Sequence, residues 1–199
     1  MKMERYVPDG ANSCQSVVRN SRFLAFAVPV SDAAGARRLV AEKRAEHPGC
    51  SHVVFAFITG GTNTENSGMS DDGEPKGTAA RPVMEVLKGS LIINVLVMVV
   101  RYFGGTKLGT GGLVKAYGDC ARDVLAGLPV KRLVPRREFR LEMPYSLHEK
   151  IRDAILEAGG EIDGVEYADL VVLTGRVPED SLAGCRGRIE DISRGAISL

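Results

Sequence analysis

Residues 91–100 read LIINVLVMVV, a run of ten residues in which only Asn94 is polar. A strand that is buried on both faces of a sheet is apolar throughout in this way, whereas a half-buried strand alternates apolar and polar residues. The run is too short to cross a bilayer as a helix, which takes about 20 apolar residues. It therefore predicts a strand over residues 91–101 that is covered on both faces.

The residues before this strand show patterns of both strands and helices. Residues 14–30 are rich in Val and Phe and are broken near Arg19, which predicts two strands joined by a tight turn. Asp32 is suited to cap a helix over 33–47, which Pro48 and Gly49 end. Residues 51–59 are rich in Val and Phe and predict another strand.

Residues 60–77 are predicted to be a loop, and loops of this length are usually either functional or disordered. The loop ends in the sequence SDDGEPKGTAARP, which gathers three carboxylates, two glycines and two prolines (70–82). A helix is expected to follow over 78–89, with Thr78 as its cap and Pro82 in its first turns.

A glycine-rich segment, YFGGTKLGTGG (102–112), lies between the buried strand and a helix predicted over 113–128. Glycines allow backbone amides to approach an anion, and a helix N-terminus adds a favourable dipole. The segment is neither a Walker A loop nor a GxGxxG fingerprint. The structural alternative is a corner that needs positive φ and tight packing.

The pattern changes after a basic linker that contains two prolines. Residues 1–137 hold 19 Lys and Arg against 12 Asp and Glu, a formal charge of +7, whereas residues 138–199 hold 7 against 13, a charge of −6. This break predicts two units with different surfaces. The second half has the order β-α-β-β-α-β of a ferredoxin-like domain, with its elements expected over 138–145, 146–159, 160–177 (two strands), 178–193 and 194–199.

The fold class predicted is therefore α+β in two domains, 1–130 and 138–199, with 131–137 as a linker. Four widely spaced cysteines form no CxxC pair, which argues against a zinc ribbon or a disulfide framework. The N-terminal residues 1–10 show no apolar signal-peptide region. We expect a cytoplasmic protein.

Two motifs, SDDGEPKGTA (70–79) and VVRYFGGTKLGTGGLVKAY (99–117), resemble the bacterial YigZ proteins of the YigZ/Impact family. The resemblance extends to NSRFLAF (20–26) and SHVVFAF (51–57) and covers residues 5–128. It implies a first domain similar to domain 2 of ribosomal protein S5, a fold also found in domain IV of elongation factor G. It implies a second domain similar to domain V of that factor. The eukaryotic member acts on translational control through an additional N-terminal domain, and that partner does not carry over.

The candidate binding residues surround the glycine-rich segment. Those predicted to contact an anion or nucleic acid are Arg81, Arg101, Gly104, Gly105, Lys107, Gly109, Gly111, Gly112 and Lys115. Asp71, Asp72 and Glu74 have several interpretations: ion pairs that order two loops, a hard-cation site, acid–base catalysts (with Asp72 and Glu74 as candidates), or a helix N-terminus.

We expect a fixed, charged loop that faces the glycine-rich segment across a groove. We expect no metal site and no cofactor. His52 is interpreted as a hydrogen-bonded core histidine, His148 as a helix-surface residue and Cys120 as a core residue. Tyr102 and Phe103 can stack on bases but more often belong to a core.

The leading hypothesis is a translation-associated regulatory protein that binds RNA or the ribosome through a basic groove near the glycine loop. No membrane or DNA partner is expected. One alternative is an enzyme that acts on a phosphorylated small molecule, although no catalytic motif supports it. A third possibility is a protein-interaction module that docks through the acidic second domain.

Overall fold

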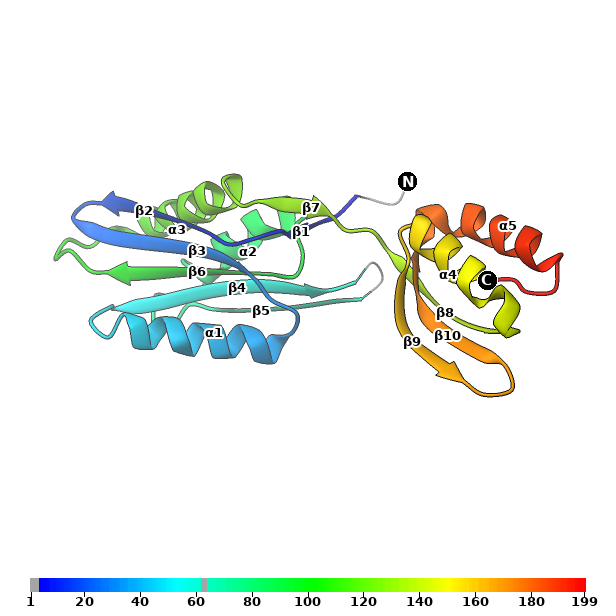
Figure 1. Cartoon of the computed structure of the whole chain (residues 1–199). Helices are drawn as coiled ribbons and strands as arrows, with labels where there is room; N and C mark the ends of the chain where they lie inside the picture. The colour runs from blue at the N-terminus through cyan, green and yellow to red at the C-terminus, as the bar shows by residue number, and fades with distance from the viewer. Residues whose placement is uncertain (1–3, 62–63) are drawn as a thin grey trace. The chain divides into compact units, whose positions relative to one another are not determined.

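The computed structural model describes residues 4–61 and 64–199, and it divides into two compact units between Leu133 and Val134 (Figure 1). We call these unit 1 and unit 2. The division lies inside the segment 131–137 that was predicted as a linker. Residues 1–3, part of the segment assessed for a signal peptide, and 62–63, part of the predicted loop 60–77, lie outside the described residues. The mixed α+β class in two units is confirmed.

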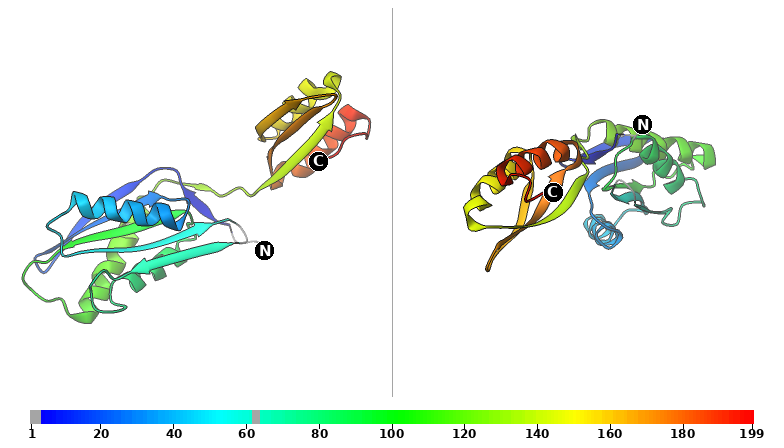
Figure 2. Two further views of the ribbon diagram at one scale, coloured as in Figure 1. Left: turned by 90° about the horizontal axis from the view of Figure 1, so that it is seen from below. Right: turned by 90° about the vertical axis from the view of Figure 1, so that its right-hand side faces the viewer.

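Unit 1 contains three helices and seven strands among its described residues. In chain order they are β1 (Tyr6–Pro8), β2 (Asn12–Val18), β3 (Ser21–Pro29), α1 (Ala33–Glu46), β4 (His52–Gly60), β5 (Glu65–Ser70), α2 (Ala80–Gly89), β6 (Val95–Tyr102), α3 (Gly109–Ala126) and β7 (Val130–Arg132). Five strands form one antiparallel sheet in the order β2-β3-β6-β4-β5, and β1 pairs with β7 in a separate ribbon. Figures 1 and 2 show α1 on one face of the sheet, with α2 and α3 on the other.

The central strand β6 carries the apolar run that predicted a doubly covered strand. Alternate residues such as Val97 and Val99 pack in the core beneath α2 and α3, whereas Leu96 and Met98 pack in the core beneath α1. Seven consecutive residues of β6 are buried. The prediction of burial on both faces is confirmed, because each face of the sheet is covered by helix.

The β2–β3 hairpin and α1 also form as predicted. Arg19 and Asn20 both have positive φ, 45° and 68°, as a two-residue hairpin turn requires. Asp32 caps α1 by accepting a hydrogen bond from the Gly35 amide at 2.7 Å. Both features were predictable because they depend on residues that are neighbours in the chain.

Helix α2 begins at Ala80 rather than at 78, and β7 enters the predicted linker 131–137. Three further differences concern residues 60–77, 91–101 and 113–128. The predicted loop 60–77 contains strand β5, a polar edge strand that pairs with β4 and therefore shows no apolar pattern. The predicted strand 91–101 begins only at Val95, since Leu91 and Asn94 have positive φ. Helix α3 begins at Gly109 rather than at 113, so its first turn includes three glycines of the predicted loop despite their poor helix propensity.

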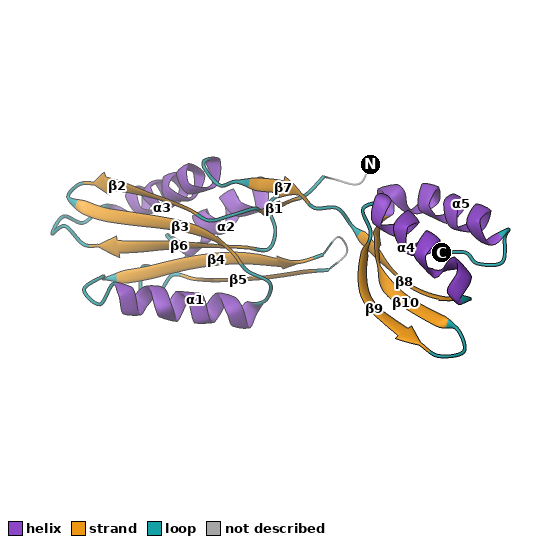
Figure 3. Ribbon diagram, in the orientation of Figure 1, coloured by secondary structure: helices purple, strands orange, loops and turns teal. Residues whose placement is uncertain are grey.

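Unit 2 packs two helices on one face of a three-stranded antiparallel sheet with the order β8-β10-β9 (Figure 3). Its elements are β8 (Arg136–Met143), α4 (Tyr145–Glu157), β9 (Glu161–Tyr167), β10 (Val171–Pro178), a 3₁₀ turn (Glu179–Ser181) and α5 (Leu182–Ser193). Ile151 of α4 and Ile189 of α5 share one core with Leu141 and Leu173 of the sheet. Both helices therefore cover the same face.

The last strand of the ferredoxin-like order is not formed. Residues 194–199 contain no strand, and Figure 3 draws them as loop. Ser193 instead ties this segment to the end of α5, because its Oγ accepts from the Ile197 amide at 3.0 Å. The apolar side chains of Ile197 and Leu199 pack on the core without joining the sheet. The described residues thus give β-α-β-β-α and not the predicted β-α-β-β-α-β.

Within the described part of the chain, no helix is long and apolar enough to span a membrane.

The cores of unit 1 share no residue with the core of unit 2, so each unit should respond to its own mutations. We expect Leu173→Ala, at a fully buried position of β10, to destabilise unit 2 by about 2–5 kcal/mol through the cavity it leaves. Hydrogen exchange followed by mass spectrometry should show faster exchange in peptides from residues 134–199 alone. Leu87→Ala, at an equally buried position of α2, is the matched control and should affect unit 1 alone. Equal acceleration in both units by either variant would contradict independent cores.

Candidate functional site

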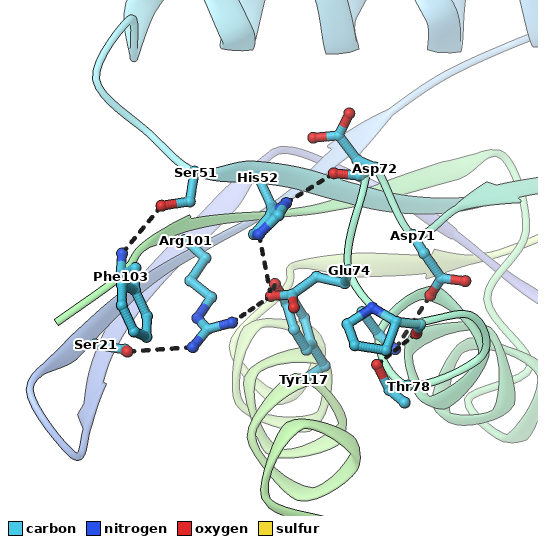
Figure 4. A network of polar contacts seen from close by, with 12 residues as sticks. Ser21, Ser51, His52, Asp71, Asp72, Glu74, Thr78, Arg101, Phe103 and Tyr117 are labelled. Carbon is cyan, nitrogen blue, oxygen red and sulfur yellow. Dashed lines mark hydrogen bonds and ion pairs between the residues drawn. The ribbon is translucent and has the colours of Figure 1, made fainter. Parts of the chain in front are cut away.

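Three buried polar side chains meet at the end of β6 (Figure 4). Arg101 donates from Nη1 to Glu74 Oε1 at 2.6 Å, and Tyr117 of α3 donates its hydroxyl to the same oxygen at 2.8 Å. The side chains of Glu74 and Arg101 are only 3% and 6% exposed. Removing either charge would leave the other buried and unpaired. The ion pair therefore ties the loop that carries Asp71, Asp72 and Glu74, which we call the acidic loop, to the central strand β6.

Arg101 also contacts the start of β3. Its Nη2 lies 3.4 Å from Ser21 Oγ, and this hydroxyl oxygen accepts from the Gly104 amide at 3.2 Å. Its Nε has no hydrogen-bond partner among the described residues. The charge of Arg101, which the sequence analysis assigned to anion binding, is therefore already matched by Glu74 inside the fold.

Tyr117, which lies within the helix predicted over 113–128, takes part in this network, a role that the sequence did not predict. Burial, and then the negative charge of Glu74 and the hydrogen bond to it, raise the pKa of Tyr117 well above its usual range. The phenol consequently keeps its proton and acts as a donor. A tyrosine on the apolar side of a predicted helix offers a signal of such a role, because a buried hydroxyl needs an acceptor.

Asp71 caps helix α2. Its carboxylate accepts from the amides of Gly77 and Ala80 at 2.8 Å each, and from that of Ala79 at 3.2 Å. Burial alone would raise the pKa of Asp71, but these three hydrogen bonds together hold it below its usual value. Thr78, predicted as the cap, instead donates from its hydroxyl to the Pro75 carbonyl at 2.6 Å. The cap comes from outside the local sequence, so the N-terminal pattern of the helix could not reveal it.

Asp72 fixes the same loop to strand β4. Its carboxylate accepts from the Val53 amide at 2.5 Å and from Arg44 of α1, and its backbone has a positive φ of 48°. His52 Nδ1 donates to the Asp72 carbonyl at 2.8 Å, and its Nε2 lies 3.9 Å from Glu74 Oε1. His52 is hydrogen-bonded as predicted, but its side chain is 23% exposed and does not belong to a core. Each acidic residue of the loop therefore has a structural partner, and Asp72 points away from Glu74 in Figure 4.

The glycine loop proper comprises residues 103–108, between β6 and α3. A Cβ at Gly104 would lie 2.0 Å from the Asn20 carbonyl oxygen, so only glycine allows the loop to approach the β2–β3 turn this closely. Gly105 and Gly109 have positive φ of 83° and 75°. These three glycines are explained by close packing and backbone conformation, the structural alternative raised by the sequence.

A cavity of about 330 Å³ lies between the acidic loop and the glycine loop. Its polar wall includes Glu74, Arg101 and Lys107, and its apolar wall includes Phe103, which is 49% exposed. The remaining lining residues are Pro75, Leu108, Gly109, Thr110 and Leu113. The structure thus brings Arg101, Lys107 and Gly109 of the predicted set together with Glu74.

The other predicted binding residues do not line this cavity. Arg81 pairs with Glu85, and Lys115 pairs with Asp119, each one helical turn away on an exposed surface. The remaining four are glycines, of which two lie in the loop and two in the first turn of α3: Gly104, Gly105, Gly111 and Gly112. No group of three or more His, Cys, Asp or Glu side chains among the described residues is arranged to hold a metal ion.

Cys120 and His148 lie outside the cavity, and both are buried. Cys120 is buried, as predicted, and burial raises the pKa of its thiol to about 11. His148, predicted on a helix surface, is instead 7% exposed and packs edge-on against Tyr167 of β9. The helix pattern of residues 146–159 did not reveal that β9 would cover this position.

Comparisons with known proteins agree over both units. The model of the Impact N-terminal domain matches residues 19–125, and a domain of unknown function (DUF1949) matches residues 141–196. The protein named IMPACT family member YigZ of Escherichia coli K12 is 35% identical over 183 residues, covering 92% of this chain and 90% of that protein. An IMPACT family member of Haemophilus influenzae is 36% identical over 164 residues, covering 78% of this chain and 80% of that protein. The crystal structure of a hypothetical protein matches 100% of this chain and 97% of its own, with 32% identity and a TM-score of 0.79.

The ion pair predicts an asymmetric response to mutation. Glu74→Gln should lower the free energy of unfolding of unit 1 by about 3–5 kcal/mol, because it leaves the Arg101 guanidinium buried without a counter-charge. The double variant Glu74→Met/Arg101→Met should be less destabilised than Glu74→Gln, since it removes both charges. Urea unfolding followed by circular dichroism measures all three. The control Glu85→Gln, which breaks only the exposed pair with Arg81, should change stability by no more than about 0.5 kcal/mol. Similar effects of Glu74→Gln and Glu85→Gln would contradict the structural role of the pair.

The cap at Asp71 predicts a pH dependence. Because the folded pKa of Asp71 is lowered, its ionised form stabilises the folded state above the pKa of an unfolded Asp, about 4. Asp71→Ala should therefore cost about 1 kcal/mol near neutral pH. The difference from wild type should shrink as the pH falls through the lowered pKa, which thermal unfolding at several pH values would show. A difference that stays constant down to acid pH would exclude the charged cap as the cause.

Proposed function

Given that this chain belongs to the Impact family, we propose that it is a translation-related regulatory protein that binds RNA or the ribosome with one end of unit 1. That end carries the glycine loop, the acidic loop and the β2–β3 turn. The resemblance of the family's two domains to domains of elongation factor G supports a partner in translation.

The observation that carries this proposal is a set of exposed cations around the cavity. Lys107 lines the cavity, Lys76 follows its lining residue Pro75, and Arg19 lies in the turn that contacts Gly104. None of the three cations forms an ion pair with another described residue, unlike most other charged residues of unit 1. Unpaired Lys and Arg side chains on neighbouring loops are suited to contact backbone phosphates.

The exposed ring of Phe103 adds a second feature suited to a nucleic acid. The Arg101 guanidinium carbon lies 5.5 Å from the Phe103 ring centre, and Ser51 Oγ accepts from the Phe103 amide at 3.3 Å. A positioned aromatic ring beside cations is a stacking surface for an unpaired base. The buried Glu74–Arg101 pair would keep this surface rigid, while Lys107 would supply the charge that a ligand meets.

The cavity itself favours a second candidate, a phosphorylated small molecule. Its volume of about 330 Å³ falls at the lower end of the range of about 300–1,000 Å³ that ligand pockets occupy. Lys107 and Thr110 lie in its wall, and α3 begins there without a side-chain cap at Leu108. A phosphate would find one cation, one hydroxyl and uncapped helix amides, with an apolar wall for the rest of the molecule.

A salt series of RNA binding tests the proposal. We expect purified protein to bind single-stranded RNA in fluorescence anisotropy, with an affinity that falls linearly in the logarithm of the salt concentration. Lys76→Ala/Lys107→Ala should weaken binding and reduce the salt slope by about 0.7 for each phosphate that the variant no longer neutralises. Arg101 is left intact because its replacement would disturb the buried pair. Lys88→Ala, at the other end of α2, is the matched control and should leave binding unchanged.

The alternative outcomes separate the two candidates. Absence of RNA binding at low salt, or equal loss with Lys88→Ala, would contradict an RNA-binding surface at this end of unit 1. Thermal stabilisation of the wild type by a nucleoside monophosphate, abolished by Lys107→Ala, would then support the small-molecule site. Neither binding activity would leave the cavity without a phosphate ligand and contradict both candidates.

A further inference from the structure

Strand β8 lies at an open edge of the unit 2 sheet. The order β8-β10-β9 leaves one side of β8 without a strand partner among the described residues. Residues 194–199, where a further strand was expected, instead turn back on Ser193. Among the described residues, the outward-facing amides and carbonyls of β8 therefore have no strand to pair with.

The solvent face of β8 carries charges of alternating sign. Leu141 and Met143 point into the core, which places the residues between and before them on the opposite face. These exposed residues are, in order along the strand, Arg136, Glu138, Arg140 and Glu142. Within one copy Arg140 contacts Glu142, and Arg136 contacts Glu161 of β9 at 3.3 Å. Exposed pairs of this kind contribute little, so they are readily exchanged for others.

This alternation is complementary to itself when two β8 strands run antiparallel. Opposite residues in an antiparallel pair share a face and a hydrogen-bonding side. With Phe139 opposite its own counterpart, Glu138 faces Arg140 of the second copy and Arg136 faces Glu142. By the two-fold symmetry, all four cross-strand pairs then join opposite charges.

The neighbouring registers lack this complementarity. Moving to the next permitted register in one direction places Arg136 opposite Arg140 and Glu138 opposite itself. Moving in the other direction places Glu138 opposite Glu142 and Arg140 opposite itself. Like charges directly opposite one another are destabilising, so the charge pattern selects the register centred on Phe139.

Strand β9, at the opposite edge of the same sheet, is not suited to pair with a second copy of itself. The solvent face of β9 carries Glu161, Asp163 and Glu166, all of them acidic, and the β9–β10 pairing is interrupted by an irregularity at Thr174 and Gly175. Two β9 strands would bring only acids together. Natural edge strands are protected from pairing by such charges and bulges. The charges of β8 alternate in sign, so a second β8 strand can match them.

We propose that two copies of this chain associate through the outer edge of β8, joining their three-stranded sheets into one continuous sheet about a two-fold axis. The contact combines backbone hydrogen bonds along β8 with the four opposite-charge pairs. It uses surfaces of unit 2 only, so it is separate from the ligand proposed for unit 1.

Sedimentation velocity of the full chain over a concentration series tests this association. We expect a monomer–dimer equilibrium that weakens as salt screens the exposed pairs. Glu138→Arg places Arg opposite Arg140, and Arg140→Glu places Glu opposite Glu138. Each variant alone should raise the dimer dissociation constant by at least about ten-fold, because two attractive pairs become repulsive.

An equimolar mixture of the two variants provides the decisive measurement. In the mixed dimer, both Arg residues of the first variant face both Glu residues of the second, so dimerisation should return to the wild-type strength. Recovery on mixing would also exclude misfolding as the cause of the loss. Glu166→Arg, a reversal of the same size on the edge strand β9, is the matched control and should not weaken the dimer.

Three results would each overturn the proposal. They are a wild-type chain that stays monomeric up to its solubility limit, single variants that dimerise as strongly as wild type, and a variant mixture that remains monomeric. A loss with Glu166→Arg equal to that with Glu138→Arg would also overturn it, because the effect would then not depend on the register of β8.

Discussion

The ion pair between Glu74 and Arg101 is the contact on which the arrangement of the candidate site depends. It joins the acidic loop to the central strand of unit 1, and Tyr117 extends it to α3. Asp71 and Asp72 anchor the same loop to α2 and β4. The acidic loop is therefore a fixed wall, because its three carboxylates are each used within the fold. These internal contacts determine the shape of the cavity beside the loop. Of the two cations that line the cavity, Arg101 is paired with Glu74, whereas Lys107 has no ion pair with a described residue.

Much of the fold could be predicted because the relevant signals are local. The apolar run of β6, the turn at Arg19 and the cap at Asp32 each depend on neighbouring residues. Strand β5 could not be predicted in this way, since its polar sequence acquires structure only by pairing with β4. The ferredoxin-like prediction for unit 2 holds as far as α5. The predicted last strand is absent from the described residues, because Ile197 and Leu199 pack on the core instead of pairing with β8.

The site was predictable in its location and not in the roles of its residues. The glycine segment and the acidic segment were expected to face each other, and both contribute to one cavity. Arg101 was assigned to a ligand because its sequence neighbours give no sign of a buried carboxylate partner. A cation next to glycines looks the same in a sequence whether it binds an anion or neutralises Glu74. The two roles can be distinguished only when the partner of the cation is seen in the structure. Here Arg101 is paired with Glu74, so Lys107 is the better candidate for contact with a ligand.

The sequence separation of these contacts also affects how the protein is made. Glu74 meets a cation 27 residues later in the chain and a phenol 43 residues later, while Arg101 reaches back 80 residues to Ser21. During synthesis, Glu74 leaves the ribosome before Arg101 and Tyr117 have been added to the chain. Non-local contacts of this kind form late. A nascent chain that stops before α3 therefore lacks Tyr117 and cannot complete this network.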